Sequence, residues 1–175
     1  MSITWLGQAS NHTEARAAIV DGFRSVFGRE PTQSEAQFAQ GVACVETGGQ
    51  YDATFYTNKV TGEKIFSTHN WGAMHCRDNP PCPPGCFEAT DVWQNCFVRC
   101  ASQEEGVRAF VRVLYTGRRS PVLAAAATGN TTSVAGAMQQ TGYFTASIAE
   151  YTDSLQGCLE RAARALGESP PSVGR

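Results

Sequence analysis

The stretch PTQSEAQFAQGVACVETGG, residues 31–49, decides the fold that we expect for the rest of the chain. Thr32 and Glu35 stand three residues apart, which is the spacing of a capping box at the start of a helix. Gly48 follows the last apolar residues and suits the C-terminal cap, because glycine adopts the left-handed conformation at little cost. The stretch therefore predicts a helix with a defined start and a defined end.

Glu46 lies near the end of this helix, at the edge of its apolar stripe. Phe38, Val42 and Val45 form the stripe. At about 100° per residue, Glu46 falls about 40° from Val42. Because a carboxyl beside apolar side chains is poorly solvated, we expect a raised pKa, which a general acid working near neutral pH requires. The alternative is a solvated glutamate in the last turn of a helix.

Helical patterns lie on both sides of an irregular middle segment. Capping signals and apolar residues at helical spacing predict further helices over residues 11–28, 102–117, 120–129, 132–140 and 147–167. Residues 50–101 instead carry prolines, aromatic residues, five cysteines and turn signals such as TGEK, which predict β-hairpins and loops. We therefore expect one mainly α (α+β) domain over residues 1–167, with the insert at about 50–101 and a disordered tail at 168–175.

The composition excludes several classes of protein. A chain of 175 residues is long enough for one domain with a core of its own. Its formal net charge of -2 leaves no basic footprint for nucleic acid, and no apolar run is long enough to span a membrane. The N-terminal MSITWLGQAS lacks the basic and apolar regions of a secretory signal. We therefore expect a protein that is made in the cytoplasm and leaves it, if at all, by a non-classical route.

Several short motifs resemble one family of enzymes. VACVETGG at 42–49, followed by THNWGAM at 68–74, is similar to the lysozyme-like peptidoglycan hydrolases, especially the glucosaminidases of glycoside hydrolase family 73. In that family a helix ending in a Glu-Thr-Gly-type signature carries the catalytic acid, and an Asn-Trp-Gly-Ala or Asn-Leu-Phe-Gly segment lines the cleft. The segments 87–114 and 141–155 continue the resemblance in the same order. The resemblance implies a lysozyme-like helical domain in which the insert forms one side of a cleft.

The same resemblance assigns catalytic roles to carboxylates. It makes Glu46 the proton donor in the hydrolysis of β-1,4 bonds between N-acetylglucosamine and N-acetylmuramic acid. The second carboxylate sits on a hairpin in the family, where Asp91, Glu63 and Glu88 are the candidates in this sequence. Asp91, before the second expected hairpin strand, is preferred as the general base, and Glu63 in the TGEK turn is placed with the substrate-binding residues. The alternative for each of them is a solvated turn residue.

Three further residues are expected to bind the substrate. Asn70 and Trp71 would supply a hydrogen bond and a stacking face for N-acetyl sugars, or else form a capped loop with a core tryptophan. Tyr143 matches the family's Gly-Tyr position and would orient the substrate or a developing charge. Tyr151 lies in the apolar stripe of the last helix, so we expect it in the core.

The seven cysteines are the main departure from that family. Five of them gather in the insert, whereas two lie apart: Cys76, Cys82, Cys86, Cys96 and Cys100, and then Cys44 and Cys158. Disulfides within 76–100 are the expected use, given an envelope or extracellular destination, and a four-thiolate zinc site is the alternative. Cys44 with His69 or His75 has the residue types of a cysteine hydrolase, but nothing marks Cys44 as a low-pKa thiol. We expect no metal or other cofactor.

The sequence thus supports two classes of function. The first is a peptidoglycan hydrolase that reaches the cell envelope through a phage tail, lysis or a secretion system. The second is a catalytically weak lysozyme-like module that binds glycan or has a structural role in a phage tail or secretion machine. Peptidoglycan strands are the expected partner of the first, together with a phage tail or secretion apparatus, or an immunity protein.

Overall fold

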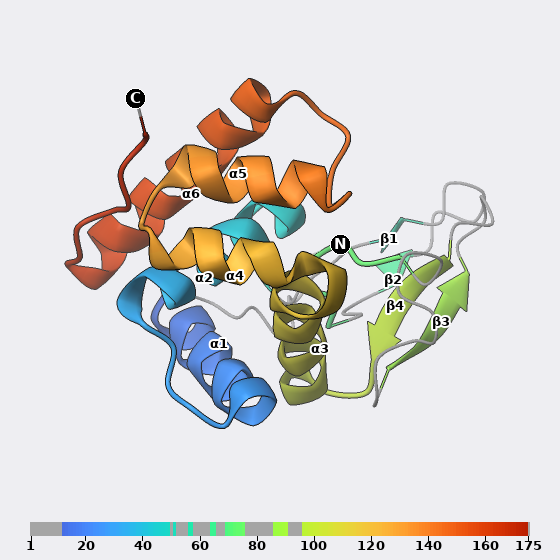
Figure 1. The fold of residues 1–175 in the computed structure, drawn as a ribbon. Coiled ribbons are helices and arrows are strands. Elements are labelled where there is room, and N and C mark those ends of the chain that lie inside the picture. The colour runs from blue at the N-terminus through green and yellow to red at the C-terminus, as the bar shows by residue number, and fades with distance from the viewer. Residues whose placement is uncertain are drawn as a thin grey trace, which may run out of the picture.

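The computed structural model describes residues 12–49, 51, 56–57, 64–65, 69–75, 86–90 and 96–174. Within them the chain is mainly helical (Figure 1), with α1 His12–Phe27, α2 Gln33–Thr47, α3 Gln103–Tyr115, the 3-10 turn η2 Gly117–Arg119, α4 Ser120–Ala127, α5 Thr131–Gln140 and α6 Ile148–Leu166. Two antiparallel hairpins occupy the insert, formed by β1 Tyr56–Thr57 with β2 Lys64–Ile65 and by β3 Cys86–Thr90 with β4 Cys96–Cys100. The mainly α fold class and the hairpins in the insert are confirmed.

Helix α2 is the central helix of the domain and is buried on all sides. Every residue from Glu35 to Cys44 is buried, because α1, α4 and α6 pack around the helix (Figure 1). Gly41 permits this close approach, since a Cβ there would lie 2.8 Å from Leu159 and 2.9 Å from Leu155 of α6. The apolar stripe expected from the sequence is therefore only one of the buried faces of α2. The neighbouring helices bury the other faces as well.

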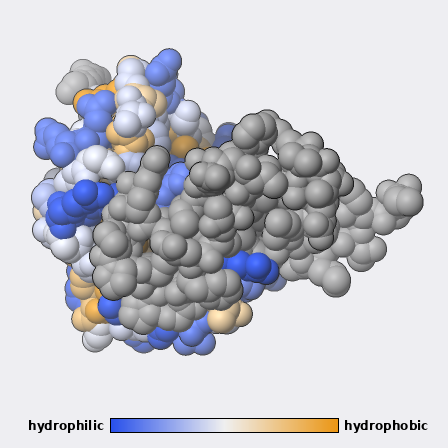
Figure 2. All heavy atoms as spheres, turned by 90° about the vertical axis from the view of Figure 1, so that its right-hand side faces the viewer, coloured by the Kyte–Doolittle hydropathy of each residue, from blue (hydrophilic) through white to orange (hydrophobic). Residues whose placement is uncertain are grey.

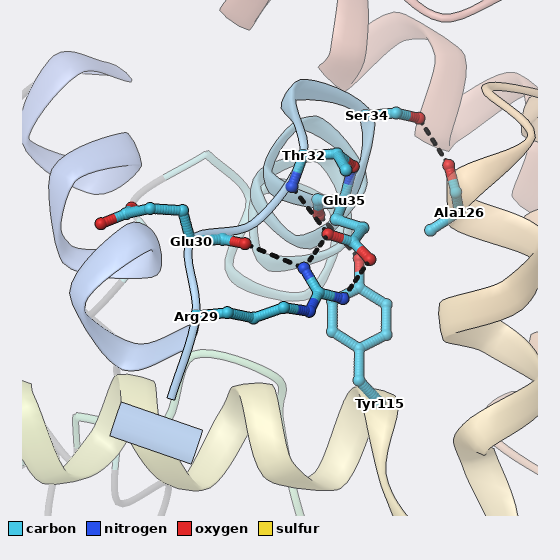
Figure 3. A network of polar contacts seen from close by, with 7 residues as sticks. All are labelled: Arg29, Glu30, Thr32, Ser34, Glu35, Tyr115 and Ala126. Atoms are coloured by element: carbon cyan, nitrogen blue, oxygen red, sulfur yellow. Dashed lines mark hydrogen bonds and ion pairs between the residues drawn. The ribbon is translucent and has the colours of Figure 1, made fainter. Parts of the chain in front are cut away.

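An ion pair between the exposed Arg29 and the buried Glu35 anchors the start of α2 (Figure 3). The Arg29 guanidinium donates to both carboxylate oxygens of Glu35, at 2.8 and 2.9 Å, and the Thr32 amide donates to Glu35 Oε2 at 2.7 Å. The predicted capping box of Thr32 and Glu35 is present. Tyr115 of α3 donates its hydroxyl to the Glu35 carbonyl oxygen at 2.8 Å. These contacts fix where α2 begins, and so where its last turn lies.

The hairpins lie on one side of the helical body, next to α3 (Figure 1). The loop 69–75 is bound to the β3–β4 hairpin, because the amide of Val98 in β4 donates to the Met74 carbonyl oxygen at 3.0 Å. Figure 2 shows this face of the molecule, where polar and apolar described residues are mixed around the grey region. Among the described residues, Ile148 and Val173 are the large apolar side chains that are exposed.

The C-terminal tail differs from the expectation of disorder at 168–175. The Thr131 amide donates to the Ser172 carbonyl oxygen at 2.9 Å, and the Ser172 amide donates to the Gly129 carbonyl oxygen at 3.0 Å. Glu168 forms an ion pair with Arg16 of α1 at 2.8 Å. Residues 168–174 are therefore held against the helical body by backbone hydrogen bonds that composition does not predict. No helix in the described part of the chain has the length and apolar character needed to cross a bilayer.

Candidate active site around Glu46

Glu46 occupies the last turn of α2, where its carboxyl is half-buried. The Tyr151 hydroxyl of α6 donates a hydrogen bond to Glu46 Oε1 at 2.9 Å. Burial disfavours the carboxylate and raises the pKa of Glu46 to about 7, although the hydrogen bond from Tyr151 works in the opposite direction. A substantial fraction of this side chain is therefore protonated at neutral pH, which agrees with the pKa direction expected from its place beside the apolar stripe.

The seam between α2 and α6 holds Glu46 and Tyr151 together. A disulfide joins Cys44, two residues before Glu46, to Cys158, which lies seven residues after Tyr151 on α6. Seven residues are close to two helical turns, so Cys158 and Tyr151 share one face of α6. The Phe144 ring stacks on the Tyr151 ring, with centroids 3.9 Å apart and planes within 5°. Phe144 thus holds the phenol that contacts Glu46, and the disulfide joins the two helices that carry these two residues.

A cavity of about 190 Å³ adjoins the Glu46 carboxyl. Its polar or charged lining residues are Glu46, His75, Arg119 and Tyr143, and its other lining residues are Gly72, Ala73, Met74 and Val113. The cavity therefore brings together the end of α2, the loop 69–75, the end of α3, the turn η2 and the segment before α6. Apart from α3 and η2, which follow each other directly, these segments are far apart in the sequence.

The charges of Glu46 and Arg119 both act on Tyr143, which lines the same cavity. Its hydroxyl donates to the Gly72 carbonyl oxygen at 3.3 Å, and the Arg119 guanidinium carbon lies 5.1 Å from the centre of its ring. Burial raises the pKa of Tyr143 well above its ordinary value, the Glu46 charge raises it further, and Arg119 lowers it. The phenol therefore stays protonated at neutral pH and acts as a hydrogen-bond donor.

The loop 69–75 forms one wall of the cavity, and its backbone adopts an unusual conformation. The Asn70 side chain accepts from the Met74 amide at 2.8 Å and donates to the Met74 carbonyl oxygen at 3.0 Å. His69 and Ala73 have positive φ angles of 49° and 45°, which residues other than glycine seldom adopt. Gly106 of α3 lets the loop approach, since a Cβ there would lie 2.0 Å from the His69 carbonyl oxygen. Such local strain is typical of functional loops.

The expected sugar contacts of Asn70 and Trp71 do not agree with their positions. Both side chains are completely buried, at 0% exposure, and neither lines the cavity. Asn70 closes the loop 69–75, and the Trp71 ring lies 6.0 Å from the Tyr51 ring in the core. The structure thus shows the other possibility, a capped loop with a core tryptophan. A sugar can stack only on an exposed ring, whereas the Trp71 ring is buried in the hydrophobic core.

The second carboxylate stays a prediction. Asp91 and Glu63 lie outside the described residues, in the connections β3–β4 and β1–β2. Glu88 lies in β3 opposite Val98 of β4, and its backbone alone is described. Among the described residues, no group of three or more histidine, cysteine, aspartate or glutamate side chains could hold a metal ion.

The cysteines correct one expectation and support another. Cys44, considered above as a nucleophile with His69 or His75, is bonded to Cys158 and therefore has no thiolate to offer. Disulfide formation is confirmed, although this pair joins two helices rather than two positions of the insert. Cys100 in the insert is also disulfide-bonded. Cys76 and Cys82 lie outside the described residues.

Sequence reasoning missed two residues of this site. Tyr151 was assigned to the core from its place in the apolar stripe, and it is indeed 6% exposed, but its hydroxyl reaches Glu46. Arg119 lies in a short turn between two helices and belongs to none of the motifs described above. The side chain of Tyr151 itself was the available signal, since a buried tyrosine hydroxyl needs a polar partner. For Arg119 the sequence offered no such signal.

A larger hollow of about 520 Å³ lies between α1 and the start of α3, away from Glu46. Its charged lining residues include Asp21, Glu104 and Arg108. Asp21 is exposed and paired with Arg24. The hollow therefore lacks a buried ionisable group, and we place the candidate site at Glu46.

Comparisons of this chain with family models, with curated proteins and with solved structures gave no match. The resemblance to the family 73 glucosaminidases is carried by short motifs alone. What the site can do must therefore be argued from its own residues.

Proposed function

We propose that this protein is a lysozyme-like glycoside hydrolase that cleaves the β-1,4 bonds between N-acetylglucosamine and N-acetylmuramic acid in peptidoglycan, with Glu46 as the general acid. The observation that carries the proposal is the half-buried Glu46 carboxyl on a cavity wall, with one oxygen held by Tyr151. Glycosidic bonds are cleaved when a carboxylic acid protonates the leaving oxygen. The motif order that resembles family 73 supports the same choice of acid.

Tyr151 prepares Glu46 for proton transfer. The pKa of Tyr151 lies well above its ordinary value, first because of burial and then because of the Glu46 charge, so the phenol remains a donor. Its hydrogen bond occupies Glu46 Oε1, which leaves Oε2 to carry the transferable proton. In the reaction this proton passes to the glycosidic oxygen while the bond to the anomeric carbon breaks, and positive charge develops on the sugar ring.

A water molecule must then attack the anomeric carbon, with its proton accepted by a second carboxylate. We propose Asp91 for this role, in the connection between β3 and β4. The backbone bond from Val98 of β4 to Met74, which lines the cavity, supports this choice, because it joins the hairpin to the cavity wall. The insert would then form one side of the cleft. Inversion follows if the two carboxyl groups stand about 6.5–9.5 Å apart.

A lysozyme-like binding or structural module is the second candidate. The observation in its favour is the cavity volume of about 190 Å³, below the roughly 300 Å³ at which pockets for drug-sized ligands begin. Such a module would hold glycan without turning it over. Both candidates predict binding of glycan strands, and only the enzyme predicts new reducing ends.

The test is digestion of purified peptidoglycan, followed by borohydride reduction and mass spectrometry of the products. Wild type should release fragments whose reduced end identifies the bond that is cut, and Glu46→Gln should release them about 10²–10⁴ times more slowly. Glu160→Gln, an exposed substitution of the same kind on α6, should behave as wild type. Binding without cleavage by wild type would favour the second candidate. Cleavage by Glu46→Gln at the wild-type rate would exclude Glu46 as the acid.

A further inference from the structure

The disulfide between Cys44 and Cys158 lies where the burial of α2 ends. Cys44 is the last buried residue of this helix, and the three residues after it, 45–47, are partly exposed. The Gly49 amide donates to the Cys44 carbonyl oxygen at 2.8 Å, so the C-terminal cap of α2 is also attached at Cys44. The bridge therefore fixes to α6 the residue from which the last turn, with Glu46, extends.

Glu46 and Tyr151 meet near the ends of their two helices. Glu46 is the residue before Thr47, where α2 ends, and Tyr151 lies in the first turn of α6, which begins at Ile148. Helix ends open more readily than helix interiors, because their terminal backbone groups lack partners within the helix. The hydrogen bond from Tyr151 to Glu46 therefore depends on how firmly α2 and α6 are held together nearby, and the Cys44–Cys158 bridge is a covalent tie between them.

Arg161 contacts both sulfur atoms of this bridge. Its Nη2 donates to Cys158 Sγ at 3.1 Å and to Cys44 Sγ at 3.6 Å. The two cysteines are 3% and 1% exposed, whereas Arg161 is exposed, so a side chain that reaches solvent covers the bridge on this side. Within the described part of the chain, no carboxylate is paired with Arg161.

A guanidinium beside a disulfide has more to offer the reduced pair than the bridge itself. A disulfide is neutral and is only a weak hydrogen-bond acceptor. A thiolate that leaves the bridge would instead gain a charge-assisted hydrogen bond from Arg161, and a neighbouring positive charge favours the thiolate over the thiol. The position of Arg161 is therefore suited to the opening and closing of the bridge.

We propose that Cys44 and Cys158 form a redox switch of the Glu46 site, in which the disulfide holds Glu46 against Tyr151, the dithiol form releases it, and Arg161 stabilises the departing Cys158 thiolate. The proposal rests on the glycosidase function proposed above. It makes the hydrolase fully active in oxidising surroundings, where disulfides persist, and weakly active where cellular dithiols keep cysteines reduced.

The co-reactant that opens the switch is a dithiol. One of its thiolates attacks Cys44 Sγ, the S–S bond breaks, and Cys158 leaves as a thiolate, because its sulfur is the nearer one to Arg161 Nη2. The second thiol of the reductant then attacks the reductant's own sulfur in the mixed disulfide and releases Cys44. Two electrons and two protons pass from the dithiol to the two cysteines, and the dithiol becomes a disulfide.

The rate of opening tests the role of Arg161. Folded protein is incubated with dithiothreitol, free thiols are trapped by alkylation at intervals, and alkylated Cys158 is quantified by mass spectrometry of its peptide. Arg161→Met should slow the opening about tenfold, because the leaving thiolate loses its charged donor. The exposed Arg164→Met on the same helix should open at the wild-type rate. Opening of Arg161→Met as fast as wild type would overturn the role given to Arg161.

A titration of Glu46 that needs no substrate tests the link between the bridge and the site. NMR of isotope-labelled glutamate carboxyls follows Glu46, whose signal is identified by its absence in Glu46→Gln. Because the Tyr151 hydrogen bond lowers the pKa of Glu46, reduction should move the titration of Glu46 to higher pH. The double variant Cys44→Ser, Cys158→Ser should titrate like reduced wild type and should not respond to dithiothreitol, which separates this bridge from the disulfide at Cys100.

Cleavage of peptidoglycan gives the second readout. The double variant should cleave at least about tenfold more slowly than oxidised wild type, since a small displacement of a catalytic group has a large effect on rate. An unchanged titration of Glu46 in the dithiol form would overturn the switch. Loss of the helical circular dichroism signal on reduction would also overturn it, because the bridge would then be a requirement for folding.

The two proposals fail in different ways. A Glu46 titration that shifts on reduction, in a protein whose oxidised form does not cleave peptidoglycan, refutes the glycosidase alone. Cleavage at equal rates by wild type and by the double cysteine variant refutes the switch alone.

Discussion

Replacing Glu46 with glutamine should stabilise the folded protein above neutral pH while it abolishes catalysis. Burial raises the pKa of Glu46 from its ordinary value of 4.5 to about 7. The folded state therefore binds this proton more tightly than the unfolded state does. Wild-type stability should decrease as the pH rises from about 4.5 to about 7, because the unfolded chain then ionises Glu46 more readily. Glutamine has no proton to lose, so this decrease should be absent.

The magnitude follows from the same pKa values. At about 1.4 kcal/mol for each pH unit, a pKa raised from 4.5 to about 7 corresponds to roughly 3 kcal/mol of lost stability once Glu46 is fully ionised. Glu46 is half-buried, and the Tyr151 hydroxyl donates more strongly to a carboxylate than to an amide. We therefore expect Glu46→Gln to be more stable than wild type by about 1–3 kcal/mol at pH 8, and equally stable at pH 4.

Urea unfolding followed by circular dichroism at pH 4, 6 and 8 measures this difference. The exposed Glu160→Gln serves as the matched control and should follow wild type at each pH. In parallel, wild-type kcat/KM should fall as the pH rises through about 7, where the general acid loses its proton. A stability difference between Glu46→Gln and wild type that stays constant with pH would refute the argument, since it would show that Glu46 titrates as in the unfolded chain.

Three further substitutions test how the site is held. Tyr151→Phe removes a hydrogen bond that favours ionised Glu46, so the pKa of Glu46 should rise and the alkaline limb of the pH–rate profile should move to higher pH. The double variant Cys44→Ser, Cys158→Ser opens a bridge across 114 residues and should lose about 2–5 kcal/mol in urea unfolding. Gly106→Ala brings a Cβ within 2.0 Å of a backbone oxygen of the loop that lines the cavity, so activity and melting temperature should both fall.

The controls for these variants are available in the same chain. Gly136→Ala, in α5, has nothing within 4 Å of the new Cβ and should raise stability by about 0.5–1 kcal/mol. If Gly106→Ala were equally harmless, the close approach of α3 to the loop would not matter. An unchanged alkaline limb in Tyr151→Phe would show that the phenol does not influence the acid. If the double cysteine variant unfolded at the same urea midpoint as wild type, the disulfide would not contribute to the stability of the α2–α6 contact.

Local features of the fold were predictable because they depend on neighbours in the sequence. Thr32 caps α2 through the predicted capping box, and Gly48 ends it at φ 62°, since each residue acts within one turn. Ser102 and Ser147 likewise accept from the backbone three residues later. The insert formed hairpins where turn signals separate β-prone residues. The tail was misjudged because its order comes from contacts with other segments, which its composition does not encode.

For the candidate site, the sequence by itself determined that Glu46 stands in the last turn of a helix beside apolar side chains. Helical periodicity sets that angle without reference to the rest of the chain. Only the tertiary structure decided which groups meet the carboxyl: Tyr151 lies 105 residues away and reaches it because α6 packs on α2. It also brought Arg119 to the same cavity and buried Trp71. Such contacts depend on how whole helices pack, and packing is a property of the complete core.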